Sequence, residues 1–361
     1  MTVIPRVRPV AIACASVMTI FVIFASSARL QSQGAPSDSA RREPTPNRAA
    51  RPAWPPVLTG PAPGDVEVLP VKGNVYMISG AGANITVQVG DEGILMVDTG
   101  IASMSEKVWA AVRTLSKGKL RYVINTADLP DHIGGNITIA AKGEIVPLRE
   151  KTYNAGPMGT IEYNRASVIA YLTVLNRMSA PTGEVSPTPP AAWPDNTYST
   201  QLKRFSFNAE PVVISHETAN TDGNSVVLFR RSDVVSAGDL LDLTNFPMID
   251  LKAGGNLQGM IAALNHLIDA TVPEAHAAGG TMVIPGHGRV ADHAEVAYYR
   301  DMLTIVKERI EDMIKKRMTL AQIKTAHPAR EYEPRYGHTT GTWTTDAFVE
   351  AAYRSLMPGT N

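Results

Sequence analysis

The pattern that most restricts the fold of this chain is an alternation of short apolar runs with amphipathic segments. In the first half, the runs VEVLPV, VYMIS, ITVQVG and GILMVDTG are rich in β-branched residues and are bounded by Gly, Asn or Asp, which is typical of strands. Residues 105–115 place Val108, Trp109, Val112 and Leu115 on one face, which predicts a helix, and LRYVIN predicts the next strand. The alternation predicts an α/β architecture in which helices cover sheets.

The second half repeats this alternation. RFSFNAEPVVISH, SVVLFR and DVVSAGD predict strands, residues 257–268 predict a helix, and TMVIPGHG predicts a buried strand that ends in a loop. From residue 292 to about 316 apolar side chains recur every three or four positions, and WTTDAFVEAAYRSL predicts a closing helix. Met302, Met313 and Met318 are interpreted as core filling. We predict one globular domain over residues 65–361, with C-terminal helices in 292–361.

The N-terminus resembles a secretory signal. Arg6 and Arg8 precede an apolar run from residue 10 to 24, and small residues follow up to Ala28. This predicts a signal peptide over residues 1–28 and an exported protein, periplasmic or extracellular. An uncleaved membrane anchor is the alternative, because the run is nearly long enough to span a bilayer. Residues 29–64, rich in Pro, Ala and Arg, predict a disordered linker.

Composition excludes some classes of partner. The 34 basic and 34 acidic residues balance, so no basic excess indicates nucleic-acid binding. No membrane contact is expected beyond the possible N-terminal anchor, and the expected partner is a small-molecule substrate or ligand. The single cysteine, Cys14, lies in the predicted signal, so the mature chain has no disulfide. The oligomeric state is not determined by these features.

Potential metal ligands occur at four places in the globular part. They are Asp131 and His132 in PDHIGGN, Asn220 in HETANTDGN, Asp239 in SAGDLLD, and His287 in IPGHG. Each is flanked by Gly or Pro, which places it where a strand gives way to a loop. Functional side chains are common at such positions.

These motifs, together with Asp98 in MVDTG, resemble those of the metallo-β-lactamase superfamily in order and spacing, over about residues 66–290. VLNRMSAPTG, EPRYG and WTTDAFVEAAYRSL are similar to a secreted subgroup of metallo-hydrolases. The resemblance implies a four-layer αβ/βα sandwich with a C-terminal helical extension. It also implies a hydrolase with two divalent metals, often zinc, bridged by a water or hydroxide.

The resemblance assigns the ligands unevenly. The first metal site would use histidines at positions where this chain has Ala127, Leu129 and Asn220, so all three imidazoles are missing. The second site would use Asp131, His132, Asp239 and His287, and all four are present. This implies one divalent metal, with zinc expected and iron or manganese as alternatives. A metal would also offset the repulsion between two converging carboxylates. In the alternative without metal, Asp131 and Asp239 hold the loops by hydrogen bonds.

Other polar residues receive simpler interpretations. Asp98 is expected behind the first motif, holding it in place, and Asp128 is interpreted as a solvated loop carboxylate. His216 is interpreted as an ordinary, partly buried histidine, with a replacement metal ligand as the alternative. Gly80-Ala81-Gly82 is interpreted as a turn. Surface positions are expected for the remaining histidines of the globular part: His266, His276, His293, His327 and His338.

Three functions follow from these observations. The first is an exported hydrolase of esters, amides or lactones, in which one metal activates water and Asp131 or Asp239 is the general base. The second is a non-catalytic protein that binds a small apolar ligand or a partner in the old cleft, beside Ala127 and Leu129. The third, oxidative chemistry like that of the persulfide dioxygenases, is disfavoured because those enzymes use the first site. SVVLF lacks a nucleophile elbow, so serine hydrolysis has no support.

Overall fold

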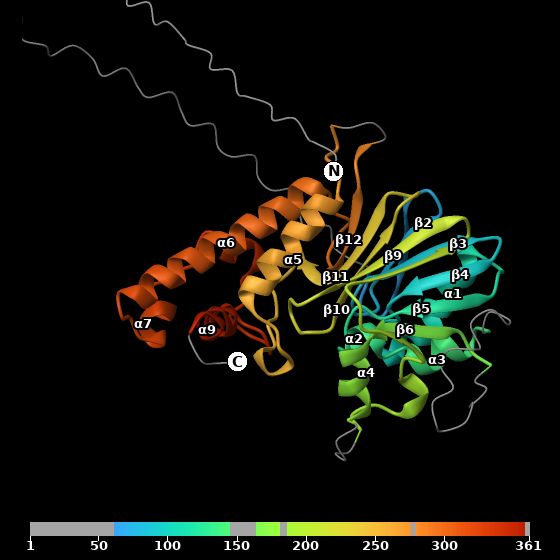
Figure 1. The fold of residues 1–361 in the computed structure, drawn as a ribbon, viewed down its shortest axis with the longest axis horizontal. Helices are drawn as coiled ribbons and strands as arrows, with labels where there is room; N and C mark the ends of the chain where they lie inside the picture. The colour runs from blue at the N-terminus through green and yellow to red at the C-terminus, as the bar shows by residue number, and fades with distance from the viewer. Residues whose placement is uncertain (1–60, 145–163, 181–185, 276–278, 358–361) are drawn as a thin grey trace, which may run out of the picture. The chain divides into compact units, whose positions relative to one another are not determined.

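The computed structural model describes residues 61–144, 164–180, 186–275 and 279–357 (Figure 1). Contacts group the chain into two units, residues 1–56 and 57–361, and every described element belongs to the second unit. The predicted signal peptide, Cys14 and nearly all of the predicted linker lie outside the described residues. None of the described helices has the length and apolarity needed to span a membrane.

The first sheet has seven strands in sequence order, β1 to β7. β1 to β4 form an antiparallel meander, and β5, β6 and β7 add in parallel after β4. In the described part of residues 61–198 there are also four α-helices, α1 to α4. The helix predicted for residues 105–115 is confirmed. The elements are β1 Glu67–Lys72, β2 Val75–Ser79, β3 Ile85–Gly90, β4 Gly93–Val97, α1 Ser105–Leu115, β5 Leu120–Ile124, α2 Pro130–Ile133, α3 Asn136–Ala141, β6 Ser167–Tyr171, α4 Leu172–Ser179 and β7 Asn196–Tyr198.

The second sheet has five strands in the order β12-β11-β10-β9-β8. The run RFSFNAEPVVISH forms a hairpin rather than one strand, because Asn208 and Ala209 both have φ of 54° and reverse the chain. β11 and β12 are parallel, and α5 connects them. The elements are β8 Leu202–Phe207, β9 Glu210–Glu217, β10 Asn224–Phe229, β11 Val234–Asp242, α5 Leu257–Ala270 and β12 Met282–His287, with short 3₁₀ turns at Ala102–Met104, Pro190–Ala192 and Leu251–Ala253.

Alternating side chains assign the layers. On β4, Ile94 and Met96 pack with α1 and α3, whereas Leu95 and Val97 pack between the two sheets. On β11, Val235 joins the cluster that contains α5 and α6. Helices therefore cover the outer face of each sheet, and the sheets pack against each other in the middle (Figure 1). The predicted four-layer sandwich is confirmed.

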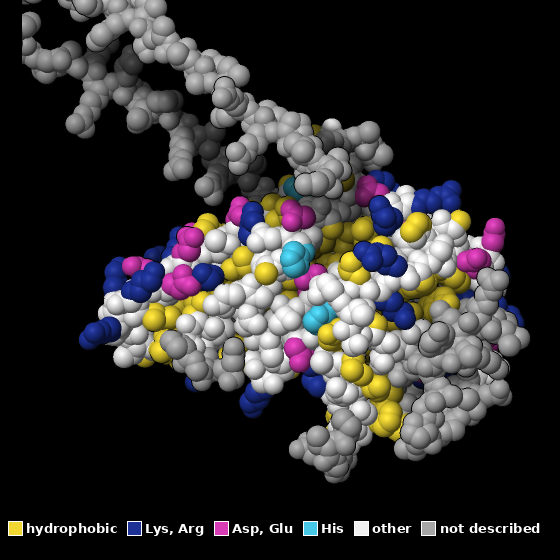
Figure 2. Space-filling view, in the orientation of Figure 1, with side chains coloured by type: hydrophobic (Ala, Val, Ile, Leu, Met, Phe, Trp, Pro, Cys, Tyr) yellow, Lys and Arg dark blue, Asp and Glu magenta, His cyan; other side chains and the backbone are white. Residues whose placement is uncertain are grey.

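The C-terminal region is helical, as predicted. It consists of α6 His293–Lys315, α7 Leu320–Thr325, α8 Glu333–Tyr336 and α9 Thr345–Leu356. Met302 is buried in the core, and Met313 and Met318 pack against the same cluster, which confirms their structural role. Acidic and basic side chains alternate along the exposed side of α6 and α7 (Figure 2). Such exposed ion pairs contribute little to stability, so the apolar face attaches this extension to the sheet.

Candidate metal centre and its cleft

Asp131 and His132 lie on α2, a single helical turn that follows β5. Pro130 is the first residue of this turn, where its fixed φ favours the helix and its missing N–H costs nothing. The loop that contains α2 is closed by Asn125 and Asn136, which donate to each other at 3.1 and 2.8 Å. Thr99 also donates to Asn136, at 3.0 Å. These buried amides fix the position of α2 relative to the sheet.

Asp98 contacts the His132 ring on its Nδ1 side. The Asp98 carboxylate lies 2.8 Å from Nδ1 of His132 and accepts hydrogen bonds from the backbone N–H and the hydroxyl of Thr126 at 2.8 and 2.6 Å. Asp98 is buried, and its φ of 60° is unusual for a non-glycine residue. With Nδ1–H donating to Asp98, the lone pair of His132 Nε2 faces the opposite side, toward β11.

Asp239 and His287 come from neighbouring strands. Asp239 lies near the end of β11, and His287 is the last residue of the parallel strand β12. The two strands approach each other closely here, as shown by the fact that a Cβ atom on Gly286 would collide with Oδ1 of Asp239. The glycine of the IPGHG motif therefore allows the Asp239 carboxylate to lie against the backbone of β12.

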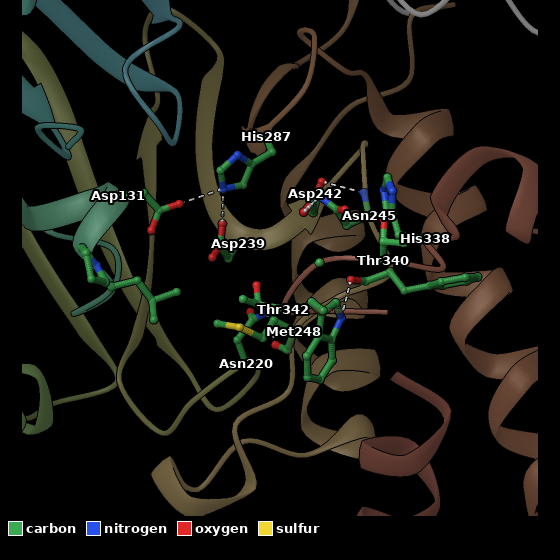
Figure 3. Close-up of a pocket in the computed structure, with 15 residues that line it drawn as sticks. Asp131, Asn220, Asp239, Asp242, Asn245, Met248, His287, His338, Thr340 and Thr342 are labelled. Atoms are coloured by element: carbon green, nitrogen blue, oxygen red, sulfur yellow. Dashed lines mark hydrogen bonds and ion pairs between the residues drawn. The ribbon is translucent and has the colours of Figure 1, made fainter. Parts of the chain in front are cut away.

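The four predicted ligands converge on one region. Oδ1 of Asp239 lies 3.1 Å from Nε2 of His132 and 3.5 Å from Nε2 of His287. Nε2 of His287 is also 3.1 Å from Oδ2 of Asp131, and Asp131, His132 and His287 offer ligand atoms within 4.8 Å of one another. Figure 3 shows Asp131 and Asp239 directed at the His287 ring from different sides.

Two atoms of this cluster lack a hydrogen-bond partner. Nε2 of His132 and Oδ1 of Asp239 are both buried, and they are out of line for a hydrogen bond with each other. Burying polar atoms without partners is costly. A cation between or beside them would give both atoms a partner.

The pKa values describe how the cluster holds a proton in the absence of a metal. Burial opposes protonation of His132, but Asp239 and Asp98 outweigh it and raise its pKa well above the usual value. Burial would raise the pKa of Asp239, but His132 and then His287 lower it to about 2. Burial would lower the pKa of His287, but Asp131 and Asp239 outweigh this effect and raise it above the usual value. A metal must displace protons from these imidazoles.

The cluster fits a divalent ion of the zinc type. Tetrahedral coordination at about 2.1 Å places donor atoms roughly 3.4 Å apart, and three of the six separations among the four residues are 3.1, 3.1 and 3.5 Å. Two imidazole nitrogens and two carboxylate oxygens suit zinc, iron or manganese. The donor types present are therefore compatible with the ion that the sequence predicts, and Asp131, His132 and His287 form the group whose ligand atoms all lie within 4.8 Å of one another.

The three positions without histidine have different environments. Ala127 is fully buried, whereas Leu129 and Asn220 line the cleft. Nδ2 of Asn220 donates to the backbone oxygen of Met248 at 2.8 Å, and its buried Oδ1 has no hydrogen-bond partner. This side of the cleft therefore offers one amide oxygen and an aliphatic side chain in place of three imidazoles.

The interpretation of Asp128 as a solvated loop carboxylate is wrong, because its side chain is paired with an arginine. Nε and Nη2 of Arg177, on α4, donate to its two oxygens at 2.8 and 2.9 Å. Arg177 also pairs with Asp222. It thus joins the loop of Ala127 and Leu129 to the loop of Asn220. The sequence analysis missed Arg177, and the only available signal was its place in the quoted segment VLNRMSAPTG.

The cleft has a volume of about 570 Å³ and extends from the cluster to the C-terminal extension (Figure 3). Asp242, at the end of β11, lines it and accepts hydrogen bonds from Thr244 and Asn245. His338 is exposed, as predicted, but it also lines this cleft. Trp343 donates to the backbone oxygen of Phe246 at 3.1 Å, which attaches the extension to the loop after β11. Sequence analysis did not assign Asp242 or Trp343 to the site.

The other described histidines are not part of the cluster. His216 is partly buried, stacks on Tyr171 with ring centroids 3.6 Å apart, and is engaged with the backbone oxygen of Asp222. His266 and His327 are exposed. His293 is partly buried beside Thr271, so its expected surface position is wrong. His276 lies outside the described residues.

Replacing Asp98 by Ala is expected to weaken metal binding by about 10- to 100-fold, because Nδ1 of His132 would lose its carboxylate partner and keep only the Thr126 hydroxyl, 3.0 Å away, to orient the ring. Competition with a chromophoric chelator measures the affinity. Asp91→Ala, which removes an exposed carboxylate, is the control and should leave the affinity unchanged. Equal affinity in Asp98→Ala and the unmodified chain would contradict the role of Asp98.

The αβ/βα sandwich, with imidazoles and carboxylates at strand ends, defines the class of fold to which this chain belongs. A family model of the metallo-β-lactamase superfamily matches residues 78–287, which is more than half of the chain. The chain belongs to this superfamily. No curated protein sequence matches it.

Solved structures share the fold at low sequence identity. The sec-alkylsulfatase Pisa1 from Pseudomonas sp. is 12% identical with a TM-score of 0.53, and a double mutant of this alkylsulfatase is 15% identical with a TM-score of 0.56. Both matches cover 81% of this chain and 51% of the other, so the chain spans about half the length of these alkylsulfatases. A metallo-β-lactamase from Pontibacter korlensis is 16% identical, with coverages of 66% and 99% and a TM-score of 0.49.

Proposed function

We propose that this chain is a hydrolase that works with a single divalent metal, held by Asp131, His132, Asp239 and His287. The observation that carries the proposal is the pair of buried, unpartnered atoms, Nε2 of His132 and Oδ1 of Asp239, 3.1 Å apart. Membership of the superfamily supports hydrolysis as the reaction type. Zinc is the proposed ion, with iron and manganese as alternatives.

When bound, such an ion lowers the pKa of a water molecule and polarises the bond to be cleaved. Asp131 is proposed as the general base, because its side chain is 31% exposed and lines the cleft. Asp239 is less suited to this role, because its carboxylate is only 10% exposed and lies against both imidazoles. Its proposed role is to keep the two rings at their mutual spacing.

The proposed substrates are esters, amides or lactones. The structural neighbours include proteins named alkylsulfatase and metallo-β-lactamase, and one fold hosts many substrates. Without imidazoles at 127, 129 and 220, two metals cannot share a hydroxide in the cleft. The proposed hydrolysis is therefore slower than, or different from, that of two-metal relatives. Export is also proposed, from residues 1–28, which lie outside the described part.

Binding without catalysis is a second candidate function, favoured by the cleft wall. Leu129, Phe246, Met248 and Trp343 give the cleft an apolar side. Apolar walls with few polar groups are typical of small-molecule sites. In this case the chain would bind a small apolar ligand and would not hydrolyse it.

Elemental analysis of the mature chain tests the metal proposal, and one ion per chain is expected. More than one ion would contradict the single site, and none after incubation with zinc would contradict metal binding. Turnover of a neutral ester such as p-nitrophenyl acetate distinguishes the two functions. Turnover that His287→Ala abolishes would support hydrolysis, whereas a metal-loaded chain without turnover would support binding alone.

A further inference from the structure

The cleft is acidic. Among the described residues that line it, three are aspartates, Asp131, Asp239 and Asp242, and two are histidines, His287 and His338. No lysine or arginine is found in this described lining. One divalent ion would offset two of the three negative charges. A ligand with a carboxylate or sulfate group would therefore meet carboxylates without a guanidinium or ammonium partner.

Two arginines of the neighbouring loops do not change this balance, and one of them, Arg289, is paired with Glu295. Arg177 is paired with Asp128 and Asp222. It lines a different pocket, together with Ile133 and Met178. Its charge is thus already used in holding the two loops together.

Asn220 adds a specific polar contact to the cleft wall. The Met248 carbonyl accepts from Nδ2 and thereby determines the orientation of the amide, since a flipped amide would place two oxygens together. Oδ1 is then the remaining atom, and it is buried without a partner in a residue that is 2% exposed. A buried acceptor of this kind lacks only a donor, which an N–H or O–H group of a ligand entering the cleft would supply in place of water. Figure 3 shows Asn220 beside Met248, across the cleft from Asp131 and His287.

We propose that the ligand of this cleft is a neutral or cationic small molecule with an apolar body and an N–H or O–H group that donates to Oδ1 of Asn220. The apolar body would contact Leu129, Met248 and Trp343. The proposal rests on the proposed function, because it takes this cleft as the substrate site. It assigns to Asn220 a role in ligand selection at a position where a two-metal relative would have an imidazole.

Four matched probes test the proposal: 2-phenylethanol, 2-phenylethylamine, the methyl ether of 2-phenylethanol, and phenylacetate. Ligand-observed NMR titration measures their affinities for the purified chain, as isolated and after chelation of metal. We expect the alcohol to bind about fivefold to tenfold more tightly than its ether, since only the alcohol donates to Oδ1. We expect phenylacetate to bind at least about tenfold more weakly than the amine. Because the chelated arm contains no metal, its result is independent of the metal proposal.

Variants of Asn220 and Thr340 test separately the contribution of the Asn220 acceptor and that of the negative charge of the cleft. Asn220→Leu should abolish the preference for alcohol over ether, and the ether affinity reports whether the cleft is intact. Thr340→Arg, on the exposed rim, should raise phenylacetate affinity about tenfold, whereas Thr339→Arg, exposed and not lining the cleft, should not. The proposal is overturned if phenylacetate binds as tightly as the amine to the chelated chain. It is also overturned if Asn220→Leu keeps the alcohol preference, or if none of the probes binds.

Discussion

Asp239→Asn is expected to weaken metal binding by about a hundredfold to a thousandfold. Oδ1 of Asp239 lies 3.1 and 3.5 Å from the two imidazole nitrogens, so a metal bound to both rings would also contact this oxygen. Metal sites of four ligands bind with about 10–16 kcal/mol, so one ligand accounts for roughly 3–4 kcal/mol. An amide keeps the shape of the side chain but removes its charge. Isothermal titration with zinc and elemental analysis measure the loss.

Asp242→Asn is the matched control for this prediction. Asp242 lies three residues later on the same strand and also lines the cleft, but its oxygens accept hydrogen bonds from Thr244 and Asn245. It should keep one ion per chain. If Asp239→Asn binds zinc as tightly as the unmodified chain, the ion is not held by these four residues. If both variants lose the metal equally, the effect belongs to the strand end as a whole.

Arg177→Met is expected to lower the free energy of unfolding by about 2–3 kcal/mol. It leaves Asp128 and Asp222 without their cation, and breaking a fully buried ion pair costs about 3–5 kcal/mol. The lower value is expected here because the side chains of Arg177 and Asp128 remain 26% and 16% exposed. Methionine retains the apolar stem of the side chain. A fall in Tm of several degrees, measured by circular dichroism, should accompany the change.

Arg309→Met removes a second two-bonded pair, in which both nitrogens of Arg309 lie 2.7 Å from Glu331. The side chains of Arg309 and Glu331 are 39% and 50% exposed, so the free energy of unfolding is expected to fall by at most about 1 kcal/mol. Equal losses in the two variants would show that Arg177 acts only as an ordinary surface pair. A larger loss in Arg177→Met would support its role in joining the loops of Leu129 and Asn220.

Much of the fold could be predicted from local patterns. The helix at residues 105–115 and the strands around it follow from side-chain periodicity, which depends only on neighbours in the chain. The hairpin after Phe207 was missed, because its turn residues, Asn208 and Ala209, lack the glycine that usually marks such a turn. The N-terminal signal and the linker remain predictions, since they lie outside the described residues.

For the candidate site, too, some features could be predicted from the sequence and others depend on tertiary packing. Residue type and order, together with the family resemblance, predicted which four side chains hold a metal and which three positions lack a ligand. Only the tertiary structure decided that Asp131, His132 and His287 converge beside Asp239. It also decided that Asp128 is paired with Arg177, and that the C-terminal extension places His338 and Trp343 in the cleft. The physical reason is that contacts between residues distant in the chain depend on how sheets and helices pack, and no local pattern specifies that packing.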